Sequence, residues 1–135
     1  MFEDFGRTRI FTLAVGLMLM AAACGGGSRI IPTRDPSLPP YVADAVNGER
    51  LFKNESCSAC HSTGTRRITG PGLAGIDSAA ATRDSGLTAD QYIEQSIKNP
   101  GEFIVDGFNN IMPKTYSRLP QDDVDDLIAY LKILK

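Results

Sequence analysis

The residues with the clearest chemistry in this sequence lie together in Cys57-Ser58-Ala59-Cys60-His61. Two cysteines separated by two residues, with a histidine directly after the second, are typical of covalent haem attachment. One helical turn brings both sulfurs to the two vinyl groups of a single haem, and the histidine then directs its imidazole at the iron. The motif therefore predicts one haem c, bonded to Cys57 and Cys60, with His61 as an iron ligand.

Two other uses of paired cysteines are weaker alternatives. A structural zinc site needs about four cysteine or histidine ligands, whereas the chain has three cysteines and one histidine, and Cys24 lies in a leader-like segment. A thioredoxin-like dithiol requires a βαβ context, and the sequence has no such pattern. Covalent haem attachment is the interpretation that the residue counts favour.

A second iron ligand is expected among the methionines, because a thioether often pairs with histidine on a haem iron. Of the four methionines, three lie in the leader: Met1, Met18 and Met20. The remaining one, Met112, follows an apolar stretch within residues 101–117, which glycine, asparagine and proline are expected to keep irregular. His61 is the only histidine, so Met112 is predicted to be the second ligand, with a role as a core filler as the alternative.

Length and composition limit what the rest of the molecule does. The chain has 135 residues, 42% of them hydrophobic, and a formal net charge of -2. This length suits one small domain with extensions, and a buried haem would supply much of its core. Nothing in the charge balance indicates nucleic acid as a partner.

The N-terminal segment resembles a bacterial lipoprotein signal. Two arginines within residues 1–9 precede an apolar run over 10–20, and three alanines come directly before Cys24. The run is short for a membrane span but typical of a signal peptide. In lipoprotein signals the cysteine is acylated, which predicts a signal over 1–23 and a lipid on Cys24, although Ala21 replaces the usual leucine. An uncleaved anchor helix and plain secretion are the alternatives.

Residues 24–41 have the composition of a tether. They begin with three glycines and a serine, which favour a flexible coil, and continue with four prolines, which favour an extended chain. The sequence therefore predicts a domain over 42–135 held to a membrane by its lipid, on the extracytoplasmic, periplasmic side.

The first helix of this domain is predicted from apolar residues at helical spacing: Val42, Val46 (or Ala45), Gly48, Leu51 and Phe52. A glycine inside a helix costs about 1 kcal/mol relative to alanine. Its presence at position 48 therefore suggests that another backbone passes close by.

Two helices are expected between the cysteine motif and the C-terminal region. A short one covers residues 77–82. A stronger one begins at Thr88, which forms a capping box with Gln91, and stops before Pro100.

The last helix has the clearest pattern in the chain. Its apolar face consists of Val124, Leu127, Ile128, Leu131 and Leu134. Acidic residues gather in its N-terminal half: Asp122, Asp123, Asp125 and Asp126. A solvated helix start that matches the helix dipole explains this acidic run, with a docking face as the alternative. Pro120 suits a first helical turn.

The order of these motifs resembles that of class I cytochromes c over residues 42–135. The resemblance rests on Gly48-x-x-x-Phe52, Cys57-x-x-Cys60-His61, Gly70-Pro71-Gly72-Leu73, Met112-Pro113 and Asp126-Leu127-Ile128-Ala129-Tyr130-Leu131. It implies an all-α fold around one covalent haem c. In this family the proline of the Gly-Pro motif accepts a hydrogen bond from the haem-binding histidine, which implies a bond between Pro71 and His61.

The same resemblance implies that the first and last helices of the domain cross. It places Gly48 and Phe52 of the first helix against the last one. Their expected partners there are Leu127 and Tyr130.

Residues 88–108 are similar to mono-haem domains of membrane respiratory assemblies. These include the cytochrome c extension of some haem-copper oxidase second subunits and the small cytochrome subunit of alternative complex III. The similarity implies a one-electron carrier, not an enzyme, that works with redox protein partners in a respiratory or photosynthetic chain, as a subunit of a membrane complex. The alternatives are a freely docking lipoprotein carrier, a haem enzyme or gas sensor with an open iron position, and a lipoprotein that uses haem only for stability.

Overall fold

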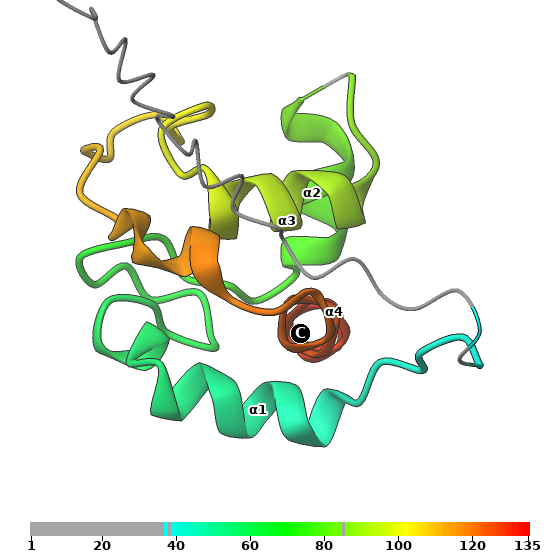
Figure 1. The fold of residues 1–135 in the computed structure, drawn as a ribbon. Coiled ribbons are helices and arrows are strands. Elements are labelled where there is room, and N and C mark those ends of the chain that lie inside the picture. The colour runs from blue at the N-terminus through cyan, green and yellow to red at the C-terminus, as the bar shows by residue number, and fades with distance from the viewer. Residues whose placement is uncertain (1–36, 38, 85) are drawn as a thin grey trace, which may run out of the picture. The chain divides into compact units, whose positions relative to one another are not determined.

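The structure, a computed structural model, describes residue 37, residues 39–84 and residues 86–135. Regular structure in these ranges is entirely helical, with no strand. The elements in chain order are α1 (Ala45–Asn54), the 3-10 helix η1 (Cys57–Ala59), α2 (Ile76–Arg83), α3 (Ala89–Lys98), the 3-10 helix η2 (Lys114–Arg118) and α4 (Gln121–Lys132), as Figure 1 shows. The predicted all-α class is confirmed.

The predicted signal over 1–23, the lipidation site Cys24 and most of the predicted tether lie outside the described residues. Within the part of the chain that the structure describes, no helix is both long enough and apolar enough to cross a membrane.

Among the described helices, α1 and α4 make the most extensive contact, and they cross one another. Figure 1 looks along α4, with α1 passing across it. Gly48 is buried at the crossing, where a Cβ would lie 2.6 Å from the carbonyl carbon of Asp126 and 2.8 Å from the Cβ of Tyr130. Phe52 and Tyr130 pack with ring centroids 5.7 Å apart, and Leu127 belongs to the same buried cluster. The predicted crossing of these two helices is confirmed.

The start of α1 differs from the prediction. Asp44 caps the helix, accepting a hydrogen bond from the backbone N–H of Val46 at 2.8 Å. The cap residue has extended backbone, so the helix begins at Ala45 and Val42 precedes it. Val42 is exposed, and Val46 is 77% exposed. The predicted apolar face is wrong at these two valines, and Ala45, the alternative, packs against the core instead.

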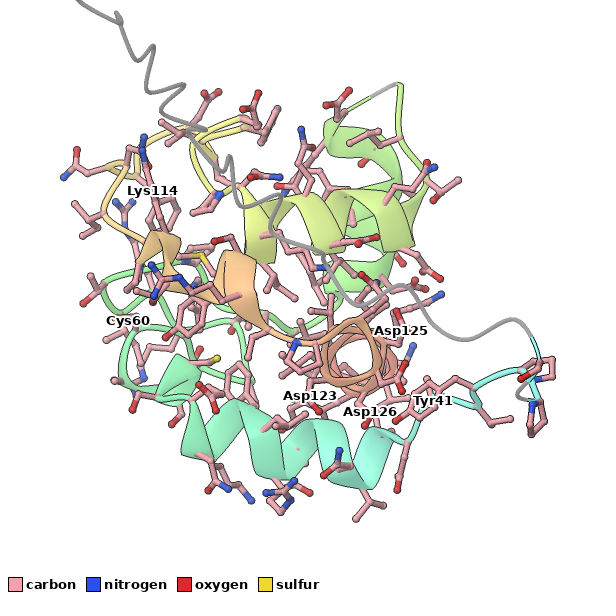
Figure 2. The ribbon with its side chains drawn as sticks, viewed as in Figure 1. Tyr41, Cys60, Lys114, Asp123, Asp125 and Asp126 are labelled. Atoms are coloured by element: carbon pink, nitrogen blue, oxygen red, sulfur yellow. The ribbon has the colours of Figure 1, made fainter. Side chains whose placement is uncertain are left out.

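Asp126 also departs from the prediction of a solvated acidic run. Its side chain is 0% exposed and accepts hydrogen bonds from the Tyr41 hydroxyl at 2.7 Å, the Asp44 backbone N–H at 2.6 Å and the Asn47 amide at 2.6 Å. Figure 2 shows the side chains of Tyr41 and Asp126 directed toward one another. Three hydrogen bonds from residues at the start of α1 offset the cost of burying this carboxylate. The prediction that the acidic run is solvated is therefore wrong for Asp126.

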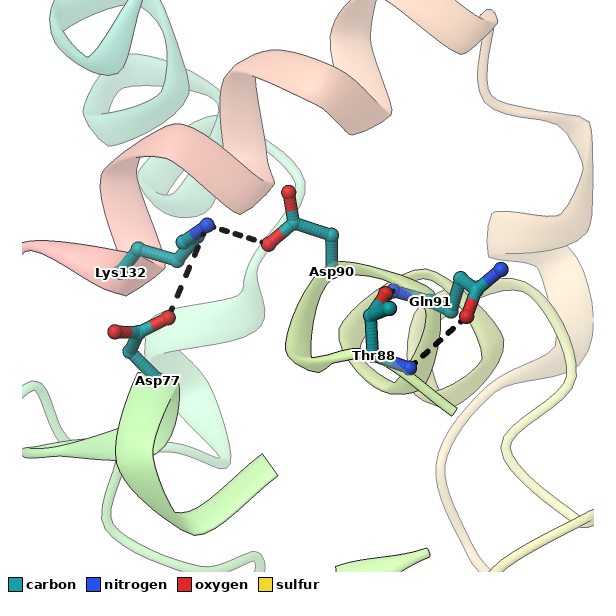
Figure 3. A network of polar contacts seen from close by, with 5 residues as sticks. All are labelled: Asp77, Thr88, Asp90, Gln91 and Lys132. Carbon is teal, nitrogen blue, oxygen red and sulfur yellow. Dashed lines mark hydrogen bonds and ion pairs between the residues drawn. The ribbon is translucent and has the colours of Figure 1, made fainter. Parts of the chain in front are cut away.

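The ends of α2, α3 and α4 are joined by a polar network, drawn in Figure 3. The predicted capping box is confirmed: the Thr88 hydroxyl accepts from the Gln91 backbone N–H at 3.3 Å, and the Gln91 side chain accepts from the Thr88 N–H at 2.9 Å. Lys132 on α4 lies 2.5 Å from Asp90 on α3 and 3.8 Å from Asp77 on α2. These contacts connect the C-terminal helix to the two helices of the central region.

The connection from α3 to α4 is irregular over most of its length, as the sequence predicted. The prediction is wrong at its end, where Lys114–Arg118 form the 3-10 helix η2 after Pro113. Proline fixes the backbone in a conformation that suits entry into a helical turn. A short helical turn therefore begins two residues after Met112.

Candidate haem site

The helices and loops line a partly open apolar cavity of about 340 Å³. Cofactor and ligand sites commonly measure about 300–1,000 Å³. The lining includes Cys57, Cys60 and His61 from the loop after α1 and Met112 from the connection between α3 and α4. Pro71 lines it as well, so the structure brings all five residues predicted to bind the cofactor to one cavity.

The two cysteines are positioned by η1. The backbone N–H groups of Cys60 and His61 both donate to the carbonyl of Cys57, at 3.1 and 3.0 Å, which closes the single turn that the motif predicted. Both cysteines are half-buried, and neither forms a disulfide. Burial raises the pKa of the Cys57 thiol. Two free sulfurs on one turn, facing one apolar cavity, fit covalent attachment to a haem.

The hydrogen bond of His61 determines which ring nitrogen is available to a metal. Its Nδ1 lies 2.9 Å from the carbonyl oxygen of Pro71. Because a carbonyl only accepts, Nδ1 must carry the proton, and the lone pair of the neutral ring is then on Nε2. Metal-binding histidines commonly donate their other ring N–H to a backbone carbonyl in this way.

Gly70 allows the His61 ring to lie against the loop that carries Pro71. A Cβ at position 70 would lie 2.8 Å from Nδ1 and 2.9 Å from Nε2 of the ring. The backbone N–H of Gly70 donates to the carbonyl of Cys60 at 2.9 Å. The glycine therefore keeps the loop close to the cysteine motif without a side chain that would displace the imidazole.

Met112 reaches the cavity at the end of the apolar connection after α3. Phe103, Ile104 and Phe108 from this connection line the cavity, which explains why an irregular segment is so apolar. The Arg67 guanidinium lies 3.9 Å from the centre of the Phe108 ring and donates a hydrogen bond to the carbonyl of Gly107. Arg67 therefore joins the loop after the cysteine motif to the segment that carries the methionine.

Two further cavity residues were not identified from the sequence. Arg83, at the end of α2, is the one side chain with a permanent charge in the lining, and Tyr116, on η2, donates from its hydroxyl to the carbonyl of Glu55 at 2.8 Å. The pKa of Tyr116 is raised, chiefly because its hydroxyl is partly buried. Neither residue belongs to a motif, so no sequence signal connects them to the site.

These residues fit a haem. The ring of a haem is largely apolar, as is most of the lining, and the two carboxylates of a haem suit an arginine, which Arg83 provides in the lining. A zinc site has no comparable support, since no group of three or more histidine, cysteine, aspartate or glutamate side chains in residues 39–84 or 86–135 is arranged so that it could hold a metal ion.

Comparison with known proteins agrees with this chemistry. The model of the family described as cytochrome c matches residues 45–135. This chain belongs to the cytochrome c family. It is 30% identical over 112 residues to a cytochrome c2 of Rhodospirillum rubrum, covering 68% of this chain and 98% of that protein. It is also 30% identical over 97 residues to a cytochrome c oxidase subunit 2 of Alkalihalophilus pseudofirmus, covering 71% of this chain and 27% of that protein.

The family and the fold together identify a class I mono-haem cytochrome c. The cytochrome carries one covalent haem c, attached through Cys57 and Cys60. It is an electron-transfer protein that works with redox partners.

Proposed function

We propose that this cytochrome carries single electrons on the outer, periplasmic side of a bacterial membrane, with His61 and Met112 as axial ligands of its iron and a lipid on Cys24 as its anchor. The observation that carries the ligand assignment is the shared cavity, which His61 and Met112 both line although they come from separate loops. The hydrogen bond from Nδ1 of His61 to Pro71 leaves Nε2 for the metal.

When bound, the haem supplies an iron that gains or loses one electron. Donation to the Pro71 carbonyl keeps the imidazole of His61 oriented and increases its basicity. The thioether of Met112 favours the reduced metal and raises the reduction potential. If His61 and Met112 both bound the iron, the protein would leave no position on the metal for a substrate, which favours a carrier over a haem enzyme or gas sensor.

The apolar lining also affects the balance between the reduced and the oxidised state of the haem. Oxidation adds a positive charge inside the cavity, and a water-poor environment disfavours a net charge. The apolar side chains of the lining, Phe103 and Phe108 among them, therefore favour the reduced state, as Met112 does. A high-potential carrier suits a late step in a respiratory chain.

We further propose that the cytochrome serves as a subunit of a membrane respiratory complex. Similarity to part of an oxidase second subunit supports this role. A freely docking carrier is the second candidate, favoured by the match to nearly the whole of a cytochrome c2. Purification of the native protein in mild detergent separates them, because a subunit elutes with fixed partners and a carrier elutes alone.

The ligand assignment is tested by Met112→Ala. Removing the thioether should abolish the weak near-infrared sulfur-to-iron band of the oxidised protein. It should also lower the potential by a sizeable part of the roughly 0.8 V range that axial ligands span. Absorption spectra and redox titration measure both effects. The neighbouring Ile111→Ala is the matched control and should retain the band, and a band that survives in Met112→Ala would show that another group binds the iron.

A further inference from the structure

The segment that carries Met112, residues 100–119, has few hydrogen bonds to remote parts of the chain. Within the described ranges there are two: the Arg67 guanidinium donates to the Gly107 carbonyl, and the Tyr116 hydroxyl donates to the Glu55 carbonyl at 2.8 Å. The other hydrogen bonds of this segment join residues close in sequence. The two remote bonds therefore restrain how far the segment can move from the haem-attachment loop.

The two bonds differ in how directly they restrain Met112. Arg67 and Gly107 are exposed, so water competes for their contact, and irregular chain separates Gly107 from Met112. Tyr116 is half-buried and lines the cavity. It lies on η2, whose helical turn begins directly after Met112-Pro113. A contact that holds Tyr116 in place therefore also restricts the position of Met112, four residues earlier.

The acceptor of the Tyr116 bond lies beside the haem cysteines. Glu55 is the residue at the C-terminal cap of α1 and precedes Cys57 by two positions. Carbonyls at the end of a helix lack partners within the helix, so the Tyr116 hydroxyl satisfies a group that the fold leaves open. The bond joins the methionine segment to the start of the cysteine turn.

We propose that the Tyr116 hydroxyl is a positioning group that keeps Met112 in place as an iron ligand. This role of Tyr116 rests on the proposed assignment of Met112 as an iron ligand. Release of Met112 requires local opening of the segment, and local opening is opposed by the contacts that are broken. Loss of one hydrogen bond of ordinary net strength increases the open fraction by roughly two- to tenfold.

The experiment measures this open fraction with imidazole as the probe. Imidazole binds the iron of the oxidised holoprotein only when Met112 is displaced, so its apparent affinity is proportional to the fraction of open molecules. Tyr116→Phe retains the ring and removes the hydroxyl. It should raise the apparent affinity for imidazole roughly two- to tenfold, measured by absorbance titration.

A matched control removes a tyrosine hydroxyl elsewhere. Tyr41→Phe deletes a donor to Asp126, a bond of 2.7 Å, at the other end of α1, and it should leave the imidazole affinity unchanged. In a Met112→Ala background no ligand has to be displaced, so adding Tyr116→Phe should have no further effect. A general loosening of the domain would instead give an increase in the control and in this background.

The experiment separates failure of the positioning role from failure of the ligand assignment. The positioning role is overturned by an unchanged affinity in Tyr116→Phe, by an equal increase in Tyr41→Phe, or by an effect that persists without Met112. If Met112→Ala itself leaves the affinity at the parent value, Met112 is not the ligand and both proposals fail. If Met112→Ala tightens imidazole binding and Tyr116→Phe does not, the role of Tyr116 alone is rejected.

Discussion

Asp126 is a single buried carboxylate that connects the beginning of the domain to its last helix. Burial by itself would raise its pKa, but hydrogen bonds donated by the Asp44 backbone N–H, the Asn47 amide and the Tyr41 hydroxyl outweigh burial and hold the pKa below the usual value. The same contact, chiefly its hydrogen bond, raises the pKa of Tyr41 to about 12. The charged form of Asp126 is therefore the one that the fold requires.

This pKa shift predicts how stability depends on acid. Because the folded pKa of Asp126 is below the unfolded value of about 3.9, its contribution is present above about pH 4 and is lost as pH falls through the folded pKa. Asp126→Asn should lower the free energy of unfolding at pH 7 by about 1–3 kcal/mol and should flatten its decrease below pH 4. Denaturant unfolding over a pH series measures this. The exposed Asp106→Asn should follow the parent curve, and parallel curves for Asp126→Asn and the parent would contradict the prediction.

Gly70 is expected to be intolerant of even the smallest side chain. Gly70→Ala would place a methyl group 2.8 Å from Nδ1 of His61, so the ring or the loop must shift and the bond to Pro71 must weaken. We expect a loss of about 1–3 kcal/mol in the free energy of unfolding and a shifted Nδ1–H resonance of His61 by NMR. Gly64→Ala is the control, because a Cβ there meets no atom within 4 Å. Equal stability of the two variants would mean that the ring is not confined by position 70.

At the scale of whole elements, the crossing of α1 and α4 gives a prediction whose sign is informative. Alanine is a better helix former than glycine by about 1 kcal/mol, so Gly48→Ala would stabilise an uncrowded helix. In this fold the added Cβ would lie 2.6 Å from the Asp126 carbonyl carbon, and overpacking of this kind costs about 1–3 kcal/mol. We therefore expect destabilisation, measured by denaturant unfolding of the holoprotein. A Gly48→Ala protein more stable than its parent would show that the helices are further apart.

The sequence predicted the elements well where one physical rule dominates. Apolar spacing located α4, the capping box located the start of α3, and the cost of a glycine inside a helix pointed to the close approach at Gly48. The cysteine motif is local as well, so its single turn could be predicted without knowledge of the fold.

Contacts that depend on tertiary structure could not be predicted in this way. Asp126 follows the pattern of a solvated helix start, and only the arrival of Tyr41, 85 positions away in sequence, makes it a buried acceptor. Tyr116 bonds to a backbone carbonyl 61 positions away, and a backbone acceptor has no sequence signature. The exposed Val46 follows from the position of the Asp44 cap, which apolar spacing does not reveal.

At the scale of the whole molecule, the composition of residues 24–41 predicts a tether with a reach of roughly 20–50 Å. At the end of this segment, the Tyr41 hydroxyl donates a hydrogen bond to Asp126 on α4, so the predicted tether would join the domain at a fixed point. A domain held in this way would stay beside the membrane and still turn toward different partners. Whether it does so depends on Cys24.

The last prediction is that the mature protein begins at an acylated Cys24. One acyl chain gives only marginal membrane binding, whereas two give stable anchoring, so a fully modified N-terminus should place the native cytochrome in the membrane fraction. Mass spectrometry of the N-terminus and fractionation of cells measure this. Cys24→Ser should move the cytochrome away from the lipid-anchored fraction while its absorption spectrum stays unchanged, because Cys24 precedes residues 45–135, which match the cytochrome c family. A native protein that begins at Met1, or that carries an unmodified Cys24, would reject the lipid anchor and leave the electron carrier without its proposed attachment.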